Sequence, residues 1–185
     1  VVVPTILCGV ATIPSVWWIA RQWFGGLAGM TAMWMIALNA LHVAYSRTAL
    51  TDVPLTLILL WAMHAVATLL ERPSLQRGMI AGLFTGIAWS LKYSGWLPLA
   101  VLISAAPVSF WFARLPREWW KQLLRAGGLA ILTAVVFWLP VLWDCQSVGG
   151  YAAVAANHAG YVRGWSAWWS GFVSLSQSYG QDNFM

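Results

Sequence analysis

Charged residues are scarce in this chain, and that scarcity excludes a soluble globular protein. Of its 185 residues, 8% are charged and 61% are hydrophobic. A soluble domain carries about 25% charged and about 45–50% apolar residues. Because a soluble core of this size could not bury such a surplus of apolar side chains, the composition predicts a membrane protein. The fifteen Trp fit this class, since Trp favours the water–lipid interface.

The sequence also has few cysteines and no recognisable metal-binding pattern. Cys8 lies inside an apolar run and Cys145 at the end of another, and two cysteines are too few for a disulfide framework. No cluster of His, Cys and carboxylate residues has the spacing of a zinc site, and there is no phosphate-binding Gly loop. The sequence predicts no disulfide, no metal site and no cofactor in this chain, although a divalent metal in a full-length enzyme is possible.

The two ends lack the marks of a complete protein. The chain begins Val-Val-Val without an initiator Met, and it has no signal-peptide pattern. It stops at Gly-Gln-Asp-Asn-Phe-Met without a recognisable closing element. We therefore interpret it as an internal fragment of a longer protein.

Long apolar runs fill most of the sequence. A spanning helix needs about 20 mostly apolar residues. Segments 2–20, 26–45, 53–70, 78–92, 95–113 and 126–143 qualify or nearly qualify. Backbone that faces lipid must satisfy its hydrogen bonds internally, so these runs must be helical. The sequence predicts an all-α, polytopic transmembrane bundle of about six helices over 1–143 plus interfacial helices. An outer-side interfacial segment follows at 144–185, with the start of a further helix after Gly171.

Successive connectors lie on opposite sides of the membrane, and this divides the basic residues into two sets. One set holds seven of the ten: Arg21, Arg72, Arg77, Arg114, Arg117, Lys121 and Arg125. Because Lys and Arg collect in cytoplasmic loops, these connectors are predicted to be cytoplasmic. Arg47, Lys92 and Arg163 then lie outside, and the first helix runs from outside to inside. This topology, and not nucleic-acid binding, explains the net charge of +5.

The connector at 114–125 mixes basic residues with Trp119 and Trp120. This composition is typical of a short amphipathic helix that lies at the inner surface. A plain cytoplasmic loop explains the same residues equally well. Neither alternative makes the segment a catalytic site.

Lys92 is the cation that most needs an explanation. It follows Arg77 by fifteen residues, about 22 Å of helix, while the hydrocarbon core is about 30 Å thick. With Arg77 at the inner surface, Lys92 does not reach the outer one, and the turn at Tyr93 and Ser94 is sunk beside a cavity. Such a cation suits an anionic ligand that arrives from the lipid. The alternative is that Lys92 snorkels to the outer headgroups.

Arg47 and Asp52 form a second candidate pair in an outer connector. Five residues of helix turn through about 500°, so the two would not share a helix face, but in a turn they could pair or converge on one ligand. Pro54 predicts the first turn of the next helix, and Asp52 is then placed to act as its N-cap. Capping explains Asp52 but leaves Arg47 unexplained.

Other polar residues have simpler explanations. Asn157, His158 and Arg163 stand among outer aromatics and are either interfacial anchors or outer-face substrate contacts. Asn39 and His42 lie three apart and favour an interhelical hydrogen bond over a metal site. His64 alone is interpreted as structural. The spacing of Gly78, Gly82 and Gly86 predicts a small-residue stripe for close helix packing.

Three stretches together resemble the GT-C membrane glycosyltransferases. In 45–55, Leu50 lies three residues after Arg47, and Asp52 lies five residues after Arg47. This pattern opens a helix in that family. The stretch 82–95 is similar to a family helix that ends in Lys-Tyr, here Lys92 and Tyr93, and 21–26 resembles the inner turn after the second helix. The nearest resemblance is to protein O-mannosyltransferases and bacterial aminoarabinose lipid A transferases, and it covers most of 1–143.

The resemblance implies a reaction and a division of roles. In such enzymes a sugar is carried on a polyprenyl phosphate, basic residues hold the carrier phosphate, and an outward-facing acidic residue is the general base. Arg47 and Lys92 would be on the phosphate side, and Asp52 would organise the site. The family's catalytic acid lies before the first helix present here, so we expect the catalytic residue upstream of Val1 and the fragment alone to be inactive.

The resemblance therefore predicts a lipid-linked sugar transferase of the bacterial inner membrane, active on the periplasmic face, with membrane lipid and a polyprenyl-phosphate-linked sugar as partners. A transporter or flippase for a lipid or small anion would also place isolated cations near a cavity, but no convincing internal repeat is present. A third alternative is a structural membrane subunit in which Arg47 and Asp52 pair.

Overall fold

The computed structural model describes residues 2–48, 50–113, 116–147, 149–150, 153, 169 and 173, and only the backbone of 110–113. All regular elements among these residues are helical, as the sequence predicted. In chain order they are α1 (Val3–Phe24), α2 (Gly26–Ala37), α3 (Ala40–Ser46), α4 (Asp52–Glu71), α5 (Leu75–Leu91), the 3₁₀ helix η1 (Tyr93–Trp96), α6 (Leu97–Ala113) and α7 (Arg117–Ser147). The chain forms two compact units, Val1–Leu139 and Pro140–Met185, and the first contains all of these helices except the end of α7.

The number of long apolar helices among the described residues is smaller than the sequence predicted. Three helices are long and apolar enough to cross a membrane, namely α1, α4 and α7, and the bent pair α2 and α3 makes a fourth if it counts as one span. The helices α5 and α6 have 17 residues each. At about 1.5 Å per residue each is about 26 Å long, less than the hydrocarbon thickness of about 30 Å.

The predicted single helix over 26–45 is interrupted. Helices α2 and α3 meet at Leu38 and Asn39 with a bend of 59°. The side chain of Asn39 accepts a hydrogen bond of 2.9 Å from the backbone N–H of His42 and so caps the start of α3. Asn is among the preferred N-cap residues because its side-chain oxygen satisfies an N–H that the helix leaves free. The prediction placed Asn39 inside one helix; its capping bond explains the break.

The helix predicted at 126–143 is longer than expected. Helix α7 runs without a break from Arg117 to Ser147. The residues from Arg117 onward in the predicted surface segment are therefore the first turns of this helix, and the prediction of a separate interfacial helix or loop there was wrong. Lys121 and Glu118 form an ion pair of 2.6 Å in these turns, three residues apart on one face.

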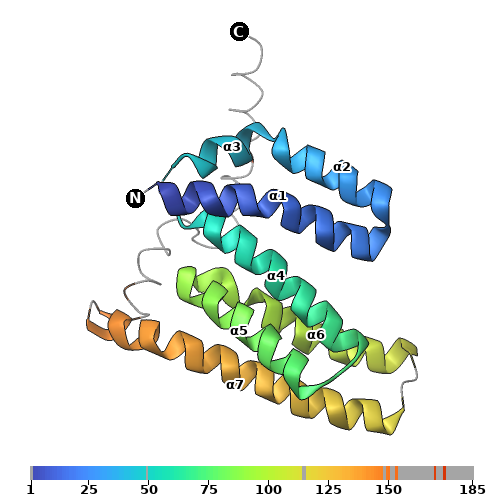
Figure 1. Ribbon diagram of the computed structural model, residues 1–185. Helices are drawn as coiled ribbons and strands as arrows, with labels where there is room; N and C mark the ends of the chain where they lie inside the picture. Colours follow the sequence, from blue (N-terminus) through green and yellow to red (C-terminus); the bar gives the residue numbers. More distant parts are fainter. Residues whose placement is uncertain are drawn as a thin grey trace. The chain divides into compact units, whose positions relative to one another are not determined.

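Contacts between helices show how the chain alternates in direction. Trp61 of α4 donates a hydrogen bond of 3.1 Å to Ser15 of α1. One turn later in α4, the ring of His64 lies 5.9 Å from that of Trp23, which is also later in α1. The contacts advance in the same direction along both helices, so α1 and α4 run parallel. Lys92, just after α5, meets Asp52 at the start of α4, so α4 and α5 run antiparallel. Figure 1 shows the last turns of α1 and α4 at the end of the bundle where α5 and α7 begin.

We call that end of the first unit the basic end. The residues that define it are Arg21, Arg72, Arg77, Arg117 and Lys121, which lie in the last turn of α1, in the α4–α5 connection, at the start of α5 and in the first turns of α7. All five belong to the set that the sequence predicted to be cytoplasmic. The opposite end of α4 and α5 holds Asp52 and Lys92.

Small residues bring α5 and α7 into close contact, as their spacing predicted. A Cβ added at Gly78 would overlap the carbonyl oxygen of Ala126, and one at Gly82 would overlap that of Ala130. A Cβ at Gly86 would lie 2.6 Å from the Cβ of Phe137. Lipid chains are as apolar as the side chains themselves, so helices in a membrane associate through such close packing.

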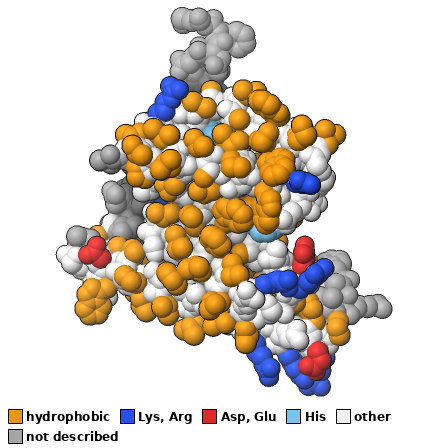
Figure 2. Space-filling model, viewed as in Figure 1, with side chains coloured by type: hydrophobic (Ala, Val, Ile, Leu, Met, Phe, Trp, Pro, Cys, Tyr) orange, Lys and Arg blue, Asp and Glu red, His pale blue; other side chains and the backbone are white. Residues whose placement is uncertain are grey.

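Large hydrophobic side chains also cover the outside of the helices. Figure 2 shows them over the broad middle of the visible face, with Lys and Arg at its edges. Leu27 is 82% exposed and Leu7 63% exposed, values that a soluble protein would not sustain across a whole surface. This chain is therefore an integral membrane protein.

Candidate functional site

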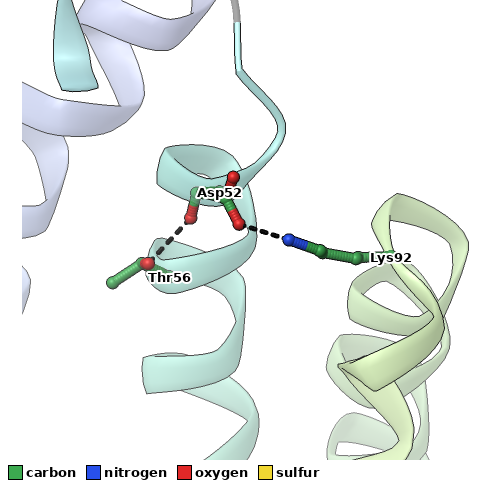
Figure 3. A network of polar contacts seen from close by, with 3 residues as sticks. All are labelled: Asp52, Thr56 and Lys92. Atoms are coloured by element: carbon green, nitrogen blue, oxygen red, sulfur yellow. Dashed lines mark hydrogen bonds and ion pairs between the residues drawn. The ribbon is translucent and has the colours of Figure 1, made fainter. Parts of the chain in front are cut away.

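The ion pair between Lys92 and Asp52 joins two helices at the end opposite the basic end. The ammonium Nζ of Lys92 lies 2.6 Å from Oδ1 of Asp52, and the two residues are 40 positions apart in the sequence. Figure 3 shows the Lys92 side chain extending from the end of α5 toward the first turn of α4. The sequence selected both residues as site candidates but did not predict that they would meet.

Asp52 occupies the first turn of α4 without capping it. Thr51 is the N-cap residue and makes no side-chain capping bond, and Asp52 is the first helical residue. The carboxylate of Asp52 binds Lys92, while its backbone carbonyl accepts a hydrogen bond of 2.7 Å from Thr56. The prediction of Asp52 as an N-cap was therefore wrong. A carboxylate in the first turn is still favourable there because the helix dipole is positive at that end.

Lys92 is positioned by the end of α5 and the turn that follows. It has extended backbone angles, and its N–H donates to the carbonyl of Ala88 at 3.1 Å. The 3₁₀ helix η1 begins at the next residue, and the N–H of Gly95 donates to the carbonyl of Lys92 at 2.9 Å. A Cβ at Gly95 would overlap the backbone of Ala88, so only glycine lets the chain turn back this closely. The expected turn after Lys92 is thus a tightly packed 3₁₀ helix.

Arg47 lies nearby in the sequence but takes no part in the ion pair. It is the residue after the last turn of α3, and its N–H donates to the carbonyl of Ala44 at 3.1 Å. Among the described residues, the carboxylate of Asp52 pairs with Lys92 and not with Arg47. The Arg47–Asp52 pair that the structural alternative assumed is not found among the described residues. This leaves the guanidinium of Arg47 with no ion-pair partner in the described part of the chain.

Arg47 also borders a small cleft between α1 and α3. The cleft has a volume of about 200 Å³ and is lined by residues of α1, α2 and α3, among them Gly9, His42 and Ser46. His42 contacts the carbonyl of Gly9 through Nε2 at 3.1 Å, which confirms the predicted interhelical hydrogen bond for His42, whereas Asn39 caps α3 instead. The bond between His42 and Gly9 holds α3 against α1 and so positions Arg47.

The exposure of the ion pair determines what it can do. The side chain of Lys92 is 37% exposed and that of Asp52 is 52% exposed. Such a pair contributes about 0–1 kcal/mol to stability. An ammonium carries three N–H donors, of which Asp52 takes one, so Lys92 can still bind an anion.

The remaining candidates fall into two groups. Asn157, His158 and Arg163, the predicted outer-face contacts, lie outside the described residues. His64 is buried in α4, and its ring packs against Trp18, Trp23 and Trp61. The Lys92–Asp52 contact is the relationship that sequence reasoning missed. The topology offered a signal, because it had placed both residues on the outer side in helices that follow each other.

Comparison with known proteins gives one family. The sequence model of the dolichyl-phosphate-mannose-protein mannosyltransferases matches residues 1–143, which include Arg47, Asp52 and Lys92. No curated protein and no solved structure gives a significant match. The match agrees with the resemblance seen in the sequence and favours the transferase interpretation over the transporter alternative.

Proposed function

Because this chain belongs to the dolichyl-phosphate-mannose-protein mannosyltransferase family, we propose that it is part of a GT-C enzyme that takes its sugar from a polyprenyl-phosphate carrier. Membership of the family makes it part of a membrane glycosyltransferase of the mannosyltransferase type. The family description itself supports a sugar carried on a lipid phosphate. The identity of the carrier, the face of the membrane and the residues involved are our proposal.

The proposed reaction takes place on the non-cytoplasmic face. The distribution of charge supports this side, because the basic end carries five cations and the opposite end of α4 and α5 carries the Lys92–Asp52 pair. Lys and Arg are enriched in cytoplasmic loops, so the end with Lys92 would face the other compartment. We extend this to the periplasmic side of a bacterial inner membrane.

In this proposal, Lys92 and Arg47 hold the phosphate of the carrier. Transfer of the sugar breaks the bond between its anomeric carbon and the phosphate oxygen, and negative charge grows on that oxygen. Cationic donors stabilise this charge more strongly than neutral ones, which lowers the barrier. The 2.6 Å contact with Asp52 fixes the ammonium of Lys92 in place, so Asp52 is a positioning residue. That contact is the single observation that carries the assignment.

The other parts of the reaction belong elsewhere in the enzyme. We assign no general base to the described residues, and from the family resemblance we propose that it lies upstream of Val1. No three His, Cys, Asp or Glu side chains come together as a metal site in the part of the chain that the structure describes. A divalent metal in the full-length enzyme would therefore need ligands from other residues.

The test uses the full-length protein in proteoliposomes with mannosyl polyprenyl phosphate as donor. We expect Lys92→Ala and Arg47→Ala each to reduce transfer by about 100-fold or more, the range for lost transition-state donors. The control is Arg125→Ala, which removes an exposed cation from α7 and should leave the rate unchanged. If transfer continues at the normal rate in both Lys92→Ala and Arg47→Ala, the phosphate assignment is wrong.

A further inference from the structure

A second polar cleft lies at the basic end, far along α4 and α5 from the Lys92–Asp52 pair. It has a volume of about 480 Å³ and opens between α4 and α5. Its lining combines an aromatic wall with charged groups: Trp61, His64, Glu71, Arg72, Arg77 and Phe84 are among its residues. The proposed transferase function uses none of them.

His64 is the buried polar residue of this cleft. Its ring lines the cleft and is only 8% exposed, yet its Nδ1 is buried without a hydrogen-bond partner among the described residues. Burying an imidazole without partners is costly, because its polar atoms give up water and gain nothing. Because Nδ1 is closed to solvent, a ligand can reach the ring only through Nε2, which is an N–H donor in the neutral tautomer protonated there.

The two arginines supply further donors at the rim. The Nη1 of Arg77 donates to the backbone carbonyl of Arg72 at 2.6 Å, which holds the guanidinium of Arg77 across the α4–α5 connection. A guanidinium has five N–H donors, so Arg77 keeps several for a ligand. With Glu71 and a neutral His64, the two arginines give the cleft a net charge of +1. A singly charged anion matches this better than a dianion.

The surroundings favour a lipid over a free anion. Trp61, Ile80 and Phe84 give the cleft an apolar side, and Ile80 is 38% exposed. An acyl chain can lie along these side chains while the headgroup contacts the charged residues of the cleft. Figure 2 shows basic and acidic side chains gathered at the edge of the hydrophobic face on this side, which is where headgroups meet the bilayer core.

We propose that this cleft binds the phosphodiester of a membrane phospholipid whose headgroup also carries a hydrogen-bond donor. Arg72, Arg77 and the N–H of His64 bind the phosphodiester oxygens, and the carboxylate of Glu71 accepts from the hydroxyl or ammonium group of the headgroup. The site lies in the leaflet next to the basic end. It does not depend on transferase activity, so its test and that of the proposed function are independent.

The experiment measures lipid retention by native mass spectrometry. The full-length protein is equilibrated in mixed micelles with phosphatidylglycerol, phosphatidylethanolamine or phosphatidylcholine, and bound lipid is counted. We expect phosphatidylglycerol and phosphatidylethanolamine to be retained at least about tenfold more than phosphatidylcholine, whose headgroup has no donor for Glu71. Equal retention of phosphatidylcholine would overturn the proposal. Displacement of the lipid by millimolar inorganic phosphate would assign the cleft to free anions instead.

Variants separate this site from general surface charge. Arg77→Gln should reduce retention by about tenfold, whereas Arg125→Gln, the same change of charge at an exposed position outside the cleft, should leave it unchanged. Equal losses in both variants would show a surface effect and contradict the proposal. His64→Phe keeps a ring in the aromatic pocket but removes both nitrogens. It should lower retention without lowering the melting temperature, and unchanged retention would remove His64 from the site.

Discussion

The Nζ of Lys92 lies 2.6 Å from Oδ1 of Asp52, and this contact joins the end of α5 to the first turn of α4. Both side chains keep more than a third of their surface exposed, so the pair is accessible to a ligand. Helix α5 is the shorter partner, and the tight turn at Gly95 keeps Lys92 at its end. The pair thus combines a defined position with an ammonium that has free donors.

Substitutions at Asp52 should show whether this residue positions Lys92 for transfer or only stabilises the fold. We expect Asp52→Asn to reduce transfer in the full-length enzyme by about tenfold or more, because the ammonium of Lys92 loses its charged partner. Its melting temperature should barely change, since an exposed pair contributes about 0–1 kcal/mol. Asp52→Glu, which keeps the charge, should recover part of the rate. A large drop in melting temperature, with no effect on the rate of the folded enzyme, would make the pair structural.

Packing between α5 and α7 should respond sharply to one methyl group. Gly82→Ala would place a Cβ against the carbonyl of Ala130 and 2.7 Å from the Cβ of Thr133, so we expect a loss of about 1–3 kcal/mol in stability. Gly128→Ala is the control, because a Cβ there has nothing within 4 Å. Alanine suits a helix better than glycine, so the control should be neutral or slightly stabilising. Thermal unfolding in detergent measures both, and equal effects would contradict the close packing.

The bond between His42 and Gly9 should make a modest contribution to stability. His42→Leu removes the 3.1 Å contact with the carbonyl of Gly9, and interhelical hydrogen bonds in membranes average about 0.6 kcal/mol, with a maximum of about 1.7. We expect a loss within that range, measured by unfolding in mixed micelles. Thr31→Val serves as control, because the hydroxyl of Thr31 donates to the carbonyl of Leu27 within its own helix. A loss at Thr31 as large as that at His42 would argue against a specific role for the bond.

The orientation in the membrane can be tested with single cysteines. In a background with Cys8→Ser and Cys145→Ser, Thr48→Cys should react with a membrane-impermeant thiol reagent added to intact cells, and Gln76→Cys should not. Both positions are exposed in the structure and lie at opposite ends of α4. Permeabilised cells, in which both cysteines should react, provide the control. The reverse pattern in intact cells would place Lys92 on the cytoplasmic side.

The sequence could predict the features that depend on local properties of the chain. A run of about 20 apolar residues predicts a membrane helix from its own composition. The order of these runs assigns each connector to one side of the membrane, and the distribution of Arg and Lys predicts which side is cytoplasmic. The glycine stripe at Gly78, Gly82 and Gly86 is likewise a matter of spacing on one helix. Lys92 and Asp52 stood out because charges are rare in such a sequence.

Only the tertiary structure showed which of these residues meet. Asn39 caps a new helix and so breaks the second apolar run, and α7 continues through residues that the sequence assigned to the membrane surface. The partner of Asp52 is Lys92, 40 residues away, and not Arg47, five residues away. Periodicity and composition describe one segment at a time, whereas such contacts depend on how the helices pack against one another. That packing joined Lys92 and Asp52 in an ion pair and left Arg47 without an ion-pair partner among the residues that the structure describes.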